Sequence, residues 1–333
     1  MLKSILLILL LGLQILYAQT EAQKEFLHYC LHEATPAQVH TIMVAAEEPT
    51  LERSCNYLSR SFVPIENMGS GMITLRNSNI TDITPLKYLK GVTEVTMEGN
   101  QVTDITPLAE LSELRKINLS YNPIREIKSL LELKKLKSLT LYSNYKLQDA
   151  SLLGKITTLE SLSFSDLNCN TSFIRKLTKL EWLSIIRVDL KDLKDLKDLK
   201  NLKELSLSTT HLEDISDIIY LKNITHLELN KQPLLTDISP LKSLKKLKYL
   251  HIENVPIKDI SALKELPNLK SLTLCNTKVA DLSVLSGKHI ELDQRDNDLR
   301  WCSPKKWDDL IKGVSCYEKD GTEKNWWKRV LRL

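Results

Sequence analysis

Apolar residues recur along this chain with a period of about 22 residues. The recurring unit reads L-x-x-L-x-L-x-x-N-x-I-x-x-I. The last apolar residues of the successive L-x-L pairs are Leu75, Met97, Leu119, Leu141, Phe164, Ile185, Leu207, Leu229, Ile252, Leu274 and Leu292. The intervals are 21 to 23 residues, except for a final interval of 18. A fixed period of this length predicts one supersecondary unit used about ten or eleven times.

The L-x-L pair predicts a short strand, because alternate side chains of a strand share one face. One such strand cannot bury its apolar face alone, so we expect parallel strands stacked about 4.8 Å apart. The Asn of the unit is expected to hydrogen-bond backbone groups in the turn. Asn is present at Asn100, Asn122 and Asn144, and it is replaced by Ser78, Thr210, Gln232, Val255 and Thr277. We therefore expect less regular turns in the C-terminal half.

A second motif, D-I-T/S-P-L, follows the Asn, as in the segment from Asp104 to Leu108. The apolar residues then recur every third position, which favours a 3₁₀-like or irregular segment over a long α-helix. The stretch from Asp189 to Leu199 repeats Asp-Leu-Lys. We interpret it as a segment of this kind with leucines inward and Asp and Lys in water, with a charged docking stripe as the alternative.

The 22-residue unit with D-I-T/S-P-L resembles the internalin-like class of leucine-rich-repeat proteins, a repeat also found in phosphatase regulatory subunits. The resemblance covers roughly Ile73 to Leu299. It implies an α/β leucine-rich-repeat solenoid over residues 71–299, with a curved parallel sheet on the concave face and a 3₁₀, short helical or irregular convex side. It also implies protein–protein recognition on the concave face.

The N-terminal segment predicts export. Lys3 precedes an apolar stretch from Ile5 to Tyr17, and small Ala18 ends it, so residues 1–18 are expected to form a secretory signal peptide. The alternative is an uncleaved anchor, although the stretch is shorter than the ~20 residues that span a bilayer. We expect a secreted, periplasmic or cell-envelope protein that begins near Gln19.

The six cysteines fit an exported protein. Cys30 and Cys55 lie before the repeats, and Cys302 and Cys316 lie after them, so each pair is expected to form a disulfide that stabilises one terminal cap. The remaining two, Cys169 and Cys275, are five repeats apart. That separation is about 24 Å, beyond the reach of a disulfide, so free thiols are expected there.

Both flanks are expected to be helical caps that cover the ends of the repeat array. Residues 19–70 include Thr35-Pro36, a good helix start, and a second helix is expected from Leu51 to Phe62. Residues 300–333 carry Trp301 and Trp307 and end in a basic, aromatic tail. The tail can contact an anionic membrane or a partner, but we favour the interpretation as an extension of the cap.

Composition and motifs argue against several classes of function. A net charge of +4 on 333 residues, with acidic and basic residues interspersed, gives no basic stripe for nucleic acid. The sequence has no G-x-S-x-G, H-E-x-x-H or P-loop motif. We therefore expect no enzyme activity, no cofactor and no metal, while a catalytic triad dispersed along the sequence is the remaining enzymatic alternative.

The x positions of each x-L-x-L-x unit are expected to face away from the core. Most of these positions hold Ser or Thr. A few hold larger or charged residues, and we predict that these bind a protein or peptide partner. The predicted partner-binding residues are Tyr142, Trp182, Ile186, His226, Glu228, Tyr249, His251 and Glu253. The alternative is that scattered exposed apolar residues carry no function.

Other hypotheses remain open from the sequence. His226, His251 and Glu228 lie on adjacent predicted strands and can bind a metal or sense pH, although solvated hydrogen-bonding pairs are commoner. Self-association as an envelope component and regulation of an intracellular enzyme are alternative functions. Four N-x-S/T sequons occur, at Asn79, Asn118, Asn170 and Asn223, and a glycan on Asn118 would cover the predicted concave face.

Overall fold

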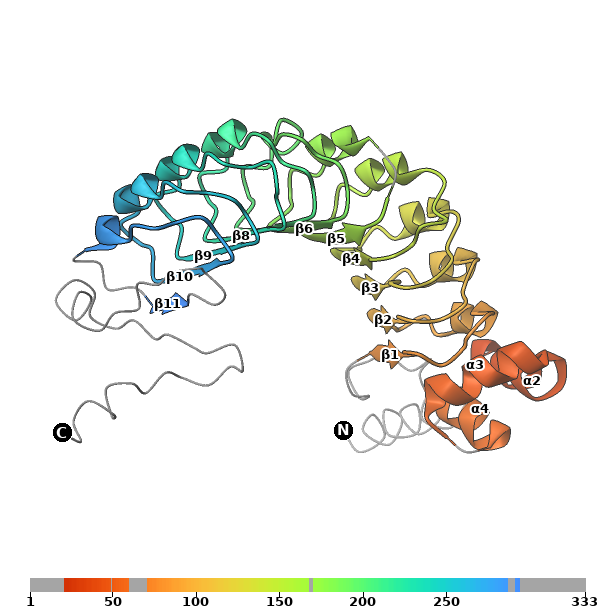
Figure 1. Cartoon of the computed structure of the whole chain (residues 1–333). Coiled ribbons are helices and arrows are strands. Elements are labelled where there is room, and N and C mark those ends of the chain that lie inside the picture. The colour runs from red at the N-terminus through yellow and green to blue at the C-terminus, as the bar shows by residue number, and fades with distance from the viewer. Residues whose placement is uncertain (1–20, 49, 60–70, 168–169, 287–290, 294–333) are drawn as a thin grey trace, which may run out of the picture. The chain divides into compact units, whose positions relative to one another are not determined.

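The computed structural model describes residues 21–48, 50–59, 71–167, 170–286 and 291–293 (Figure 1). The chain divides into two compact units, with the boundary between Lys135 and Leu136. Among the described residues, the first unit contains the N-terminal helices and three strands, and the second contains eight strands.

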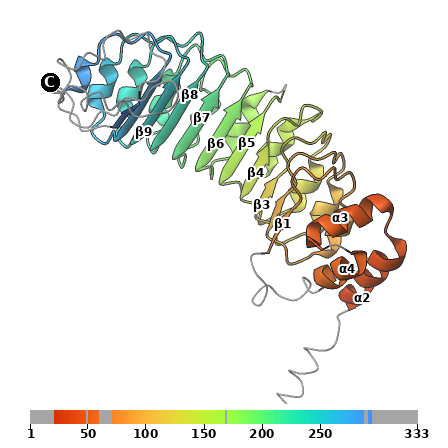
Figure 2. The same cartoon turned by 60° about the horizontal axis from the view of Figure 1, so that its bottom comes forward.

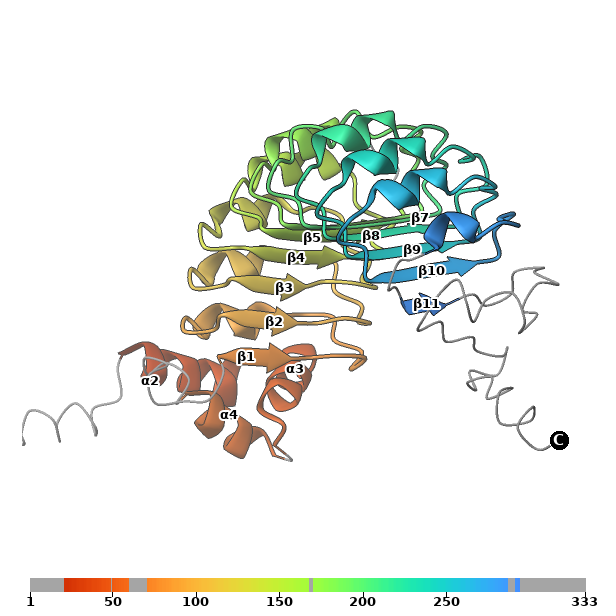
Figure 3. The same ribbon diagram turned by 90° about the vertical axis from the view of Figure 1, so that its left-hand side faces the viewer.

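Short parallel strands form one side of each unit (Figure 3). The first unit contains β1 (Met72–Thr74), β2 (Glu94–Thr96) and β3 (Lys116–Asn118). The second contains β4 (Ser138–Leu141), β5 (Ser161–Ser165), β6 (Trp182–Ile186), β7 (Glu204–Ser208), β8 (His226–Asn230), β9 (Tyr249–Glu253), β10 (Ser271–Cys275) and β11 (Glu291–Asp293). Within each unit every strand pairs with its neighbours in sequence, as expected for a leucine-rich-repeat solenoid.

Single 3₁₀ turns form the other side of most repeats, as the three-residue spacing predicted, whereas the repeat between β6 and β7 has bends and turns there. They are η4 (Thr84–Tyr88), η5 (Thr106–Glu110), η6 (Lys128–Glu132), η7 (Ala150–Lys155), η8 (Thr171–Lys176), η9 (Ser216–Tyr220), η10 (Ser239–Ser243), η11 (Ser261–Glu265) and η12 (Ser283–Leu285). In the second unit of Figure 1 these turns lie on the outer side of the arc and the strands on the inner side.

An Asp, which belongs to the D-I-T/S-P-L motif in several repeats, caps most of these turns. In each case its Oδ1 accepts a hydrogen bond of 2.7–3.1 Å from the backbone N–H two residues later, which is a hydrogen bond that the short polar side chain can reach. The capping residues are Asp82, Asp104, Asp149, Asp192, Asp214, Asp237, Asp259 and Asp281, and Asn170 does the same in η8. The Asp therefore marks the start of most of these 3₁₀ turns, whereas η6 has Glu126 at this position and Asp192 precedes a turn that is not 3₁₀.

Buried Asn side chains hold the turns that follow the strands. Asn122 is 1% exposed, and its Oδ1 accepts from the Val102 N–H at 3.1 Å. Its Nδ2 donates to the carbonyls of Met97, Leu119 and Ser120 at 2.8–3.1 Å. Each bond satisfies a buried backbone group that would otherwise be left without a partner.

Gln232 stands where the repeat unit has Asn, and a less regular turn was expected there. The turn is nevertheless held by the same kinds of hydrogen bond. Gln232 is fully buried, and its Oε1 accepts from the Leu212 N–H at 3.1 Å. Its Nε2 donates to the carbonyls of Leu207 and Asn230 and to Thr210 Oγ1. Gln therefore replaces Asn at this turn because its amide offers the same donors and acceptor.

Asp195 departs from the expected pattern of the Asp-Leu-Lys stretch. The leucines face inward, as expected: Leu193, Leu196 and Leu199 are buried. Asp195, expected in water, is only 8% exposed, because Thr171 Oγ1 donates to its Oδ2 at 2.6 Å and Arg175 Nε donates to its Oδ1 at 2.9 Å. A buried carboxylate is tolerated when it is paired and hydrogen-bonded in this way.

Helices precede the first repeat. They are α2 (Glu21–His28), the π-helical turn η1 (Tyr29–Glu33), α3 (Pro36–Ala46) and α4 (Leu51–Ser59). The expected helix start at Thr35 is present, and Thr35 and Gln38 form a reciprocal capping box. Cys30 and Cys55 are joined by a disulfide, with Cα atoms 5.9 Å apart.

The helices contact the first repeat through Asp82 and Tyr88. Thr41 Oγ1 donates to the Asp82 carbonyl at 2.6 Å, and Gln38 Nε2 donates to Asp82 Oδ2 at 2.8 Å. Burial alone would raise the pKa of Asp82, but hydrogen bonds from Thr84 and Gln38 outweigh it and hold the pKa below its usual value. The rings of Phe26 and Tyr29 lie 5.6 and 5.1 Å from the ring of Tyr88.

Several expectations fall on residues outside the described ranges. These are the signal peptide, the C-terminal cap and its tail, and Cys169, Cys302 and Cys316. Cys275 is described, and it is a buried cysteine outside the Cys30–Cys55 disulfide.

We predict that Asn122→Ala lowers the free energy of unfolding by about 2–3 kcal/mol, because it leaves several buried backbone groups without partners. Urea unfolding measures the change. The control is Asn201→Ala, which removes one exposed bond to the Thr178 carbonyl and should cost under about 1 kcal/mol. Equal losses for the two variants would contradict the role assigned to Asn122.

Candidate functional site on the open face of the sheet

Figure 2 shows the strands of the second unit's sheet side by side. The side of this sheet that carries the side chains between the buried leucines is called the open face. The strand register aligns these side chains in three columns. From β5 to β10 the first column is Ser161, Trp182, Glu204, His226, Tyr249 and Ser271. The middle column is Ser163, Ser184, Ser206, Glu228, His251 and Thr273. The third column is Ser165, Ile186, Ser208, Asn230, Glu253 and Cys275.

The register at β11 differs from the expected one. Leu292 pairs with Leu272, whereas the alignment of the repeats within the sequence placed Leu292 beside Leu274. Glu291 therefore lies beside Ser271, and Asp293 lies beside Thr273. The repeat is 20 residues long at this point, and a shift of two residues preserves which side chains face the core, so the hydrophobic pattern alone did not reveal it.

The β5–β6 part of the open face is less exposed than expected. Ser163, Ser165 and Ser184 were expected in water but are at most 3% exposed. Tyr142 follows β4, and its hydroxyl donates to Ser184 Oγ on β6 at 3.1 Å, so its side chain crosses β5. Small serines are thus covered by a larger neighbour.

The predicted partner-binding residues fall into two groups. Tyr142, Trp182 and Ile186 lie at β4–β6, and all three are half-buried. The other five lie on two adjacent strands, β8 and β9: His226, Glu228, Tyr249, His251 and Glu253. Tyr249 is the most exposed aromatic residue on strands β4 to β10, at 42%.

A shallow pocket of about 140 Å³ lies in the β8–β9 group. Four predicted residues line it, His226, Glu228, Tyr249 and His251, together with Ser271 and Thr273 of β10. Neither Ser271 nor Thr273 was predicted from the sequence, although their small size beside Tyr249 and His251 in the aligned columns was a signal for a hollow. Hence the structure brings half of the predicted set to one place.

Polar contacts position the residues around this pocket. The His226 ring stacks on Tyr249 with centroids 4.4 Å apart and an interplanar angle of 14°. Ser206 Oγ donates to Glu228 Oε2 at 2.7 Å. His251 Nε2 lies 3.3 Å from Glu253 Oε2, and His226 Nδ1 lies 3.8 Å from Glu204 Oε1.

The metal hypothesis for His226, His251 and Glu228 finds no support in this geometry. Across the residues that the structure describes, no group of three or more His, Cys, Asp or Glu side chains is placed to hold a metal ion. The strands β4 to β10 carry three glutamates and contain no Lys or Arg. This part of the open face is therefore negatively charged when its histidines are neutral.

A polar network borders the open face at the ends of β5 and β6. Arg187 donates from Nη2 to Asp166 Oδ2 at 2.7 Å and from Nε to Oδ1. Ser165 Oγ and Ser143 Oγ also donate to Asp166 Oδ2, at 2.6 and 3.1 Å. The Arg187 guanidinium lowers the pKa of Asp166 to about 2, against the opposing effect of burial and with further lowering from the serines.

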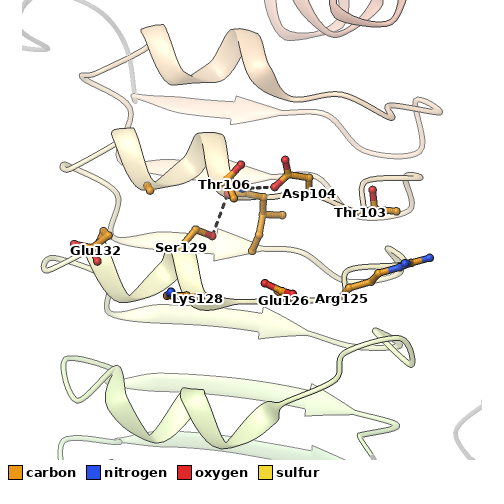
Figure 4. A pocket seen from close by; sticks show the side chains of 10 residues that line it. Thr103, Asp104, Thr106, Arg125, Glu126, Lys128, Ser129 and Glu132 are labelled. Atoms are coloured by element: carbon orange, nitrogen blue, oxygen red, sulfur yellow. Dashed lines mark hydrogen bonds between the residues drawn. The ribbon is translucent and has the colours of Figure 1, made fainter.

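A second, larger depression lies between the 3₁₀ turns η5 and η6 of the first unit (Figure 4). Its volume is about 710 Å³. At the place of the capping Asp104, the next repeat has Glu126, and both line the depression with Arg125 and Lys128. This mixture of acidic and basic groups defines no single ligand chemistry.

Comparison with known proteins supports the fold. Residues 245–287 match the family described as leucine-rich repeats (two copies). A search of curated protein sequences found no match. An internalin from Listeria monocytogenes is 21% identical to the chain with a TM-score of 0.61, and the alignment covers 86% of this chain and 96% of that one.

Two further solved structures have lower TM-scores. Internalin C2 from Listeria monocytogenes is 22% identical over 76% of this chain and 88% of that one, with a TM-score of 0.36. The leucine-rich-repeat ectodomain of the receptor kinase GASSHO1/SCHENGEN3 from Arabidopsis thaliana, in complex with Casparian strip integrity factor 2, is 15% identical. It covers 71% of this chain and 32% of that one, with a TM-score of 0.48.

No helix in the described part of the chain has the length and apolar character needed to cross a membrane.

We predict that Asp166→Asn lowers the free energy of unfolding at pH 7 by about 1–2 kcal/mol, after allowing for solvent screening at the half-exposed Arg187. Because the folded pKa of Asp166 is depressed, its stabilisation is fully present above pH ~4 and is lost as the pH falls towards 2. Asn tolerates the positive φ of 59° at this position.

Urea unfolding of both proteins between pH 7 and pH 2 measures this dependence. The difference between them should shrink below pH ~4. The exposed Asp198→Asn is the control and should change stability by less than about 0.5 kcal/mol. A difference that stays constant down to pH 2 would contradict the ion pair as its source.

The periodic leucine core, the parallel strands and the 3₁₀ turns show that the chain has a leucine-rich-repeat solenoid fold, and this fold is similar to that of the Listeria internalin.

Proposed function

We propose that this chain is an exported, non-enzymatic protein that binds a protein or peptide partner on the open face of its sheet. The observation that carries the proposal is the group on β8 and β9, where an exposed Tyr249, two histidines and two glutamates gather on a face otherwise occupied mainly by Ser and Thr. Protein interfaces are anchored by such aromatic residues in a setting of small polar ones.

The fold favours binding over catalysis. Stacked strands present a broad surface of side chains that the buried leucines do not constrain, so these positions can vary without loss of the core. The half-buried Trp182 and Ile186 on β6 extend this surface towards β4. We therefore place the partner along β6 to β9.

The test is affinity capture from native cell-surface and envelope extracts. The bait is the chain from Gln19 onward, compared with Trp182→Asp and Tyr249→Asp. We expect each variant to retain at least tenfold less of the partner, because a charged group in place of an aromatic anchor leaves an unpaired charge in the interface.

Tyr220→Asp is the matched control. Tyr220 is 45% exposed, close to the 42% of Tyr249, but lies in η9 on the other side of the repeat. Its capture should equal that of the unaltered chain. Equal capture by the chain with Tyr249→Asp would place the partner elsewhere. Concentration-dependent self-association without a heterologous partner would favour a structural role.

Export makes a separate prediction. When the full sequence is expressed in a secreting host, the protein recovered outside the cytoplasm should begin near Gln19 and contain an oxidised Cys30–Cys55 pair, as the geometry of that pair allows. N-terminal sequencing and peptide mapping without reduction measure both. Unprocessed protein in the cytosol with two free thiols would instead favour regulation of an intracellular enzyme.

A further inference from the structure

The pocket on β8–β10 has one large aromatic wall. Tyr249 is paired in register with His226 on one side and with Ser271 on the other. The His226 ring covers one face of the tyrosine ring at 4.4 Å. Ser271 is too small to cover the opposite side to the same extent, and both Ser271 and Thr273 line the pocket. A planar group therefore has room beside the exposed part of the Tyr249 ring.

The histidine in this stack is itself held in place. Thr225 Oγ1 lies 2.9 Å from His226 Nδ1, within hydrogen-bond distance. The two rings are nearly parallel, with an interplanar angle of 14°. Because the stack restricts the Tyr249 side chain before any ligand arrives, less side-chain entropy is lost on binding.

The same pocket contains a carboxylate without a cationic partner of its own. Glu228 is exposed, and Ser206 donates one hydrogen bond of 2.7 Å to its Oε2. A carboxylate accepts about four such bonds, so Glu228 retains most of its capacity. Within the described ranges, Glu204, Glu228 and Glu253 form no ion pair with a Lys or Arg, and β4 to β10 contain neither residue.

We propose that this pocket binds an arginine side chain of the partner, stacked on Tyr249 and hydrogen-bonded to Glu228. A guanidinium is planar and permanently charged, it stacks on aromatic faces, and its fork of N–H donors matches a carboxylate. An ammonium lacks the planar shape, so arginine is preferred to lysine. Because the carboxylates of the open face complement a positive charge, we expect the partner segment that binds there to contain at least one arginine.

This inference rests on the proposed function, since it specifies which chemical group of the partner enters the site. It is tested without the partner, by titrating capped arginine, capped citrulline and capped lysine into the full chain, purified from the secreting host and labelled with ¹³C in histidine and tyrosine. Citrulline has the shape of arginine but no charge. The resonances of His226, His251 and Tyr249 report on the pocket.

We expect saturable shifts of these resonances with arginine and an affinity at least fivefold lower for citrulline and lysine. Glu228→Gln and Tyr249→Leu should each weaken arginine binding at least fivefold, while Glu265→Gln, an exposed glutamate at the end of η11, should leave it unchanged. Spectra that otherwise coincide with those of the unaltered chain show that each variant is folded.

Equal shifts with citrulline, or unchanged arginine binding by the Glu228→Gln variant, would overturn the inference. The two proposals fail separately. If the chain with Glu228→Gln still captures the partner while the chain with Tyr249→Asp does not, the proposed binding function stands and the arginine pocket is rejected. If the pocket binds arginine but the chain captures no partner, the arginine pocket stands and the proposed binding function is rejected.

Discussion

The structure depends on burial of the leucine columns, which no single repeat can achieve. Strands β5 to β10 each present two apolar side chains to the core, as Leu227 and Leu229 do on β8, where both are at most 1% exposed. At about 25 cal/mol per Å² of apolar surface, this burial is the dominant favourable term. It is available only when neighbouring coils stack, so the stability of each repeat is shared with the next.

Two polar devices keep the coils in register around that core. The Asp of D-I-T/S-P-L starts the 3₁₀ turn on one side, and a buried amide such as Asn122 or Gln232 holds the turn after the strand on the other. Both satisfy backbone groups that a tight coil leaves without partners. With the backbone fixed in this way, the outward positions are free to carry function.

The open face uses that freedom unevenly. Around β5 and β6, Tyr142 crosses small serines and Arg187 pairs with Asp166, so side chains there are engaged with one another. On β8 and β9, Tyr249 stays exposed and Glu228 has spare hydrogen-bonding capacity. This contrast is the physical reason for placing the centre of recognition at β8–β9, with Trp182 and Ile186 at its margin.

The sequence by itself determined the repeat, the parallel strands, the 3₁₀ turns and the columns of outward residues from β5 to β10, because all of these follow from periodicity. Tertiary structure decided what periodicity does not encode. The register of β11 differs by two residues from the one that the periodic pattern predicted, Asp195 is buried beside Thr171 and Arg175, and Tyr142 covers Ser184. These outcomes depend on side-chain reach across neighbouring coils, and only the folded chain brings those residues together.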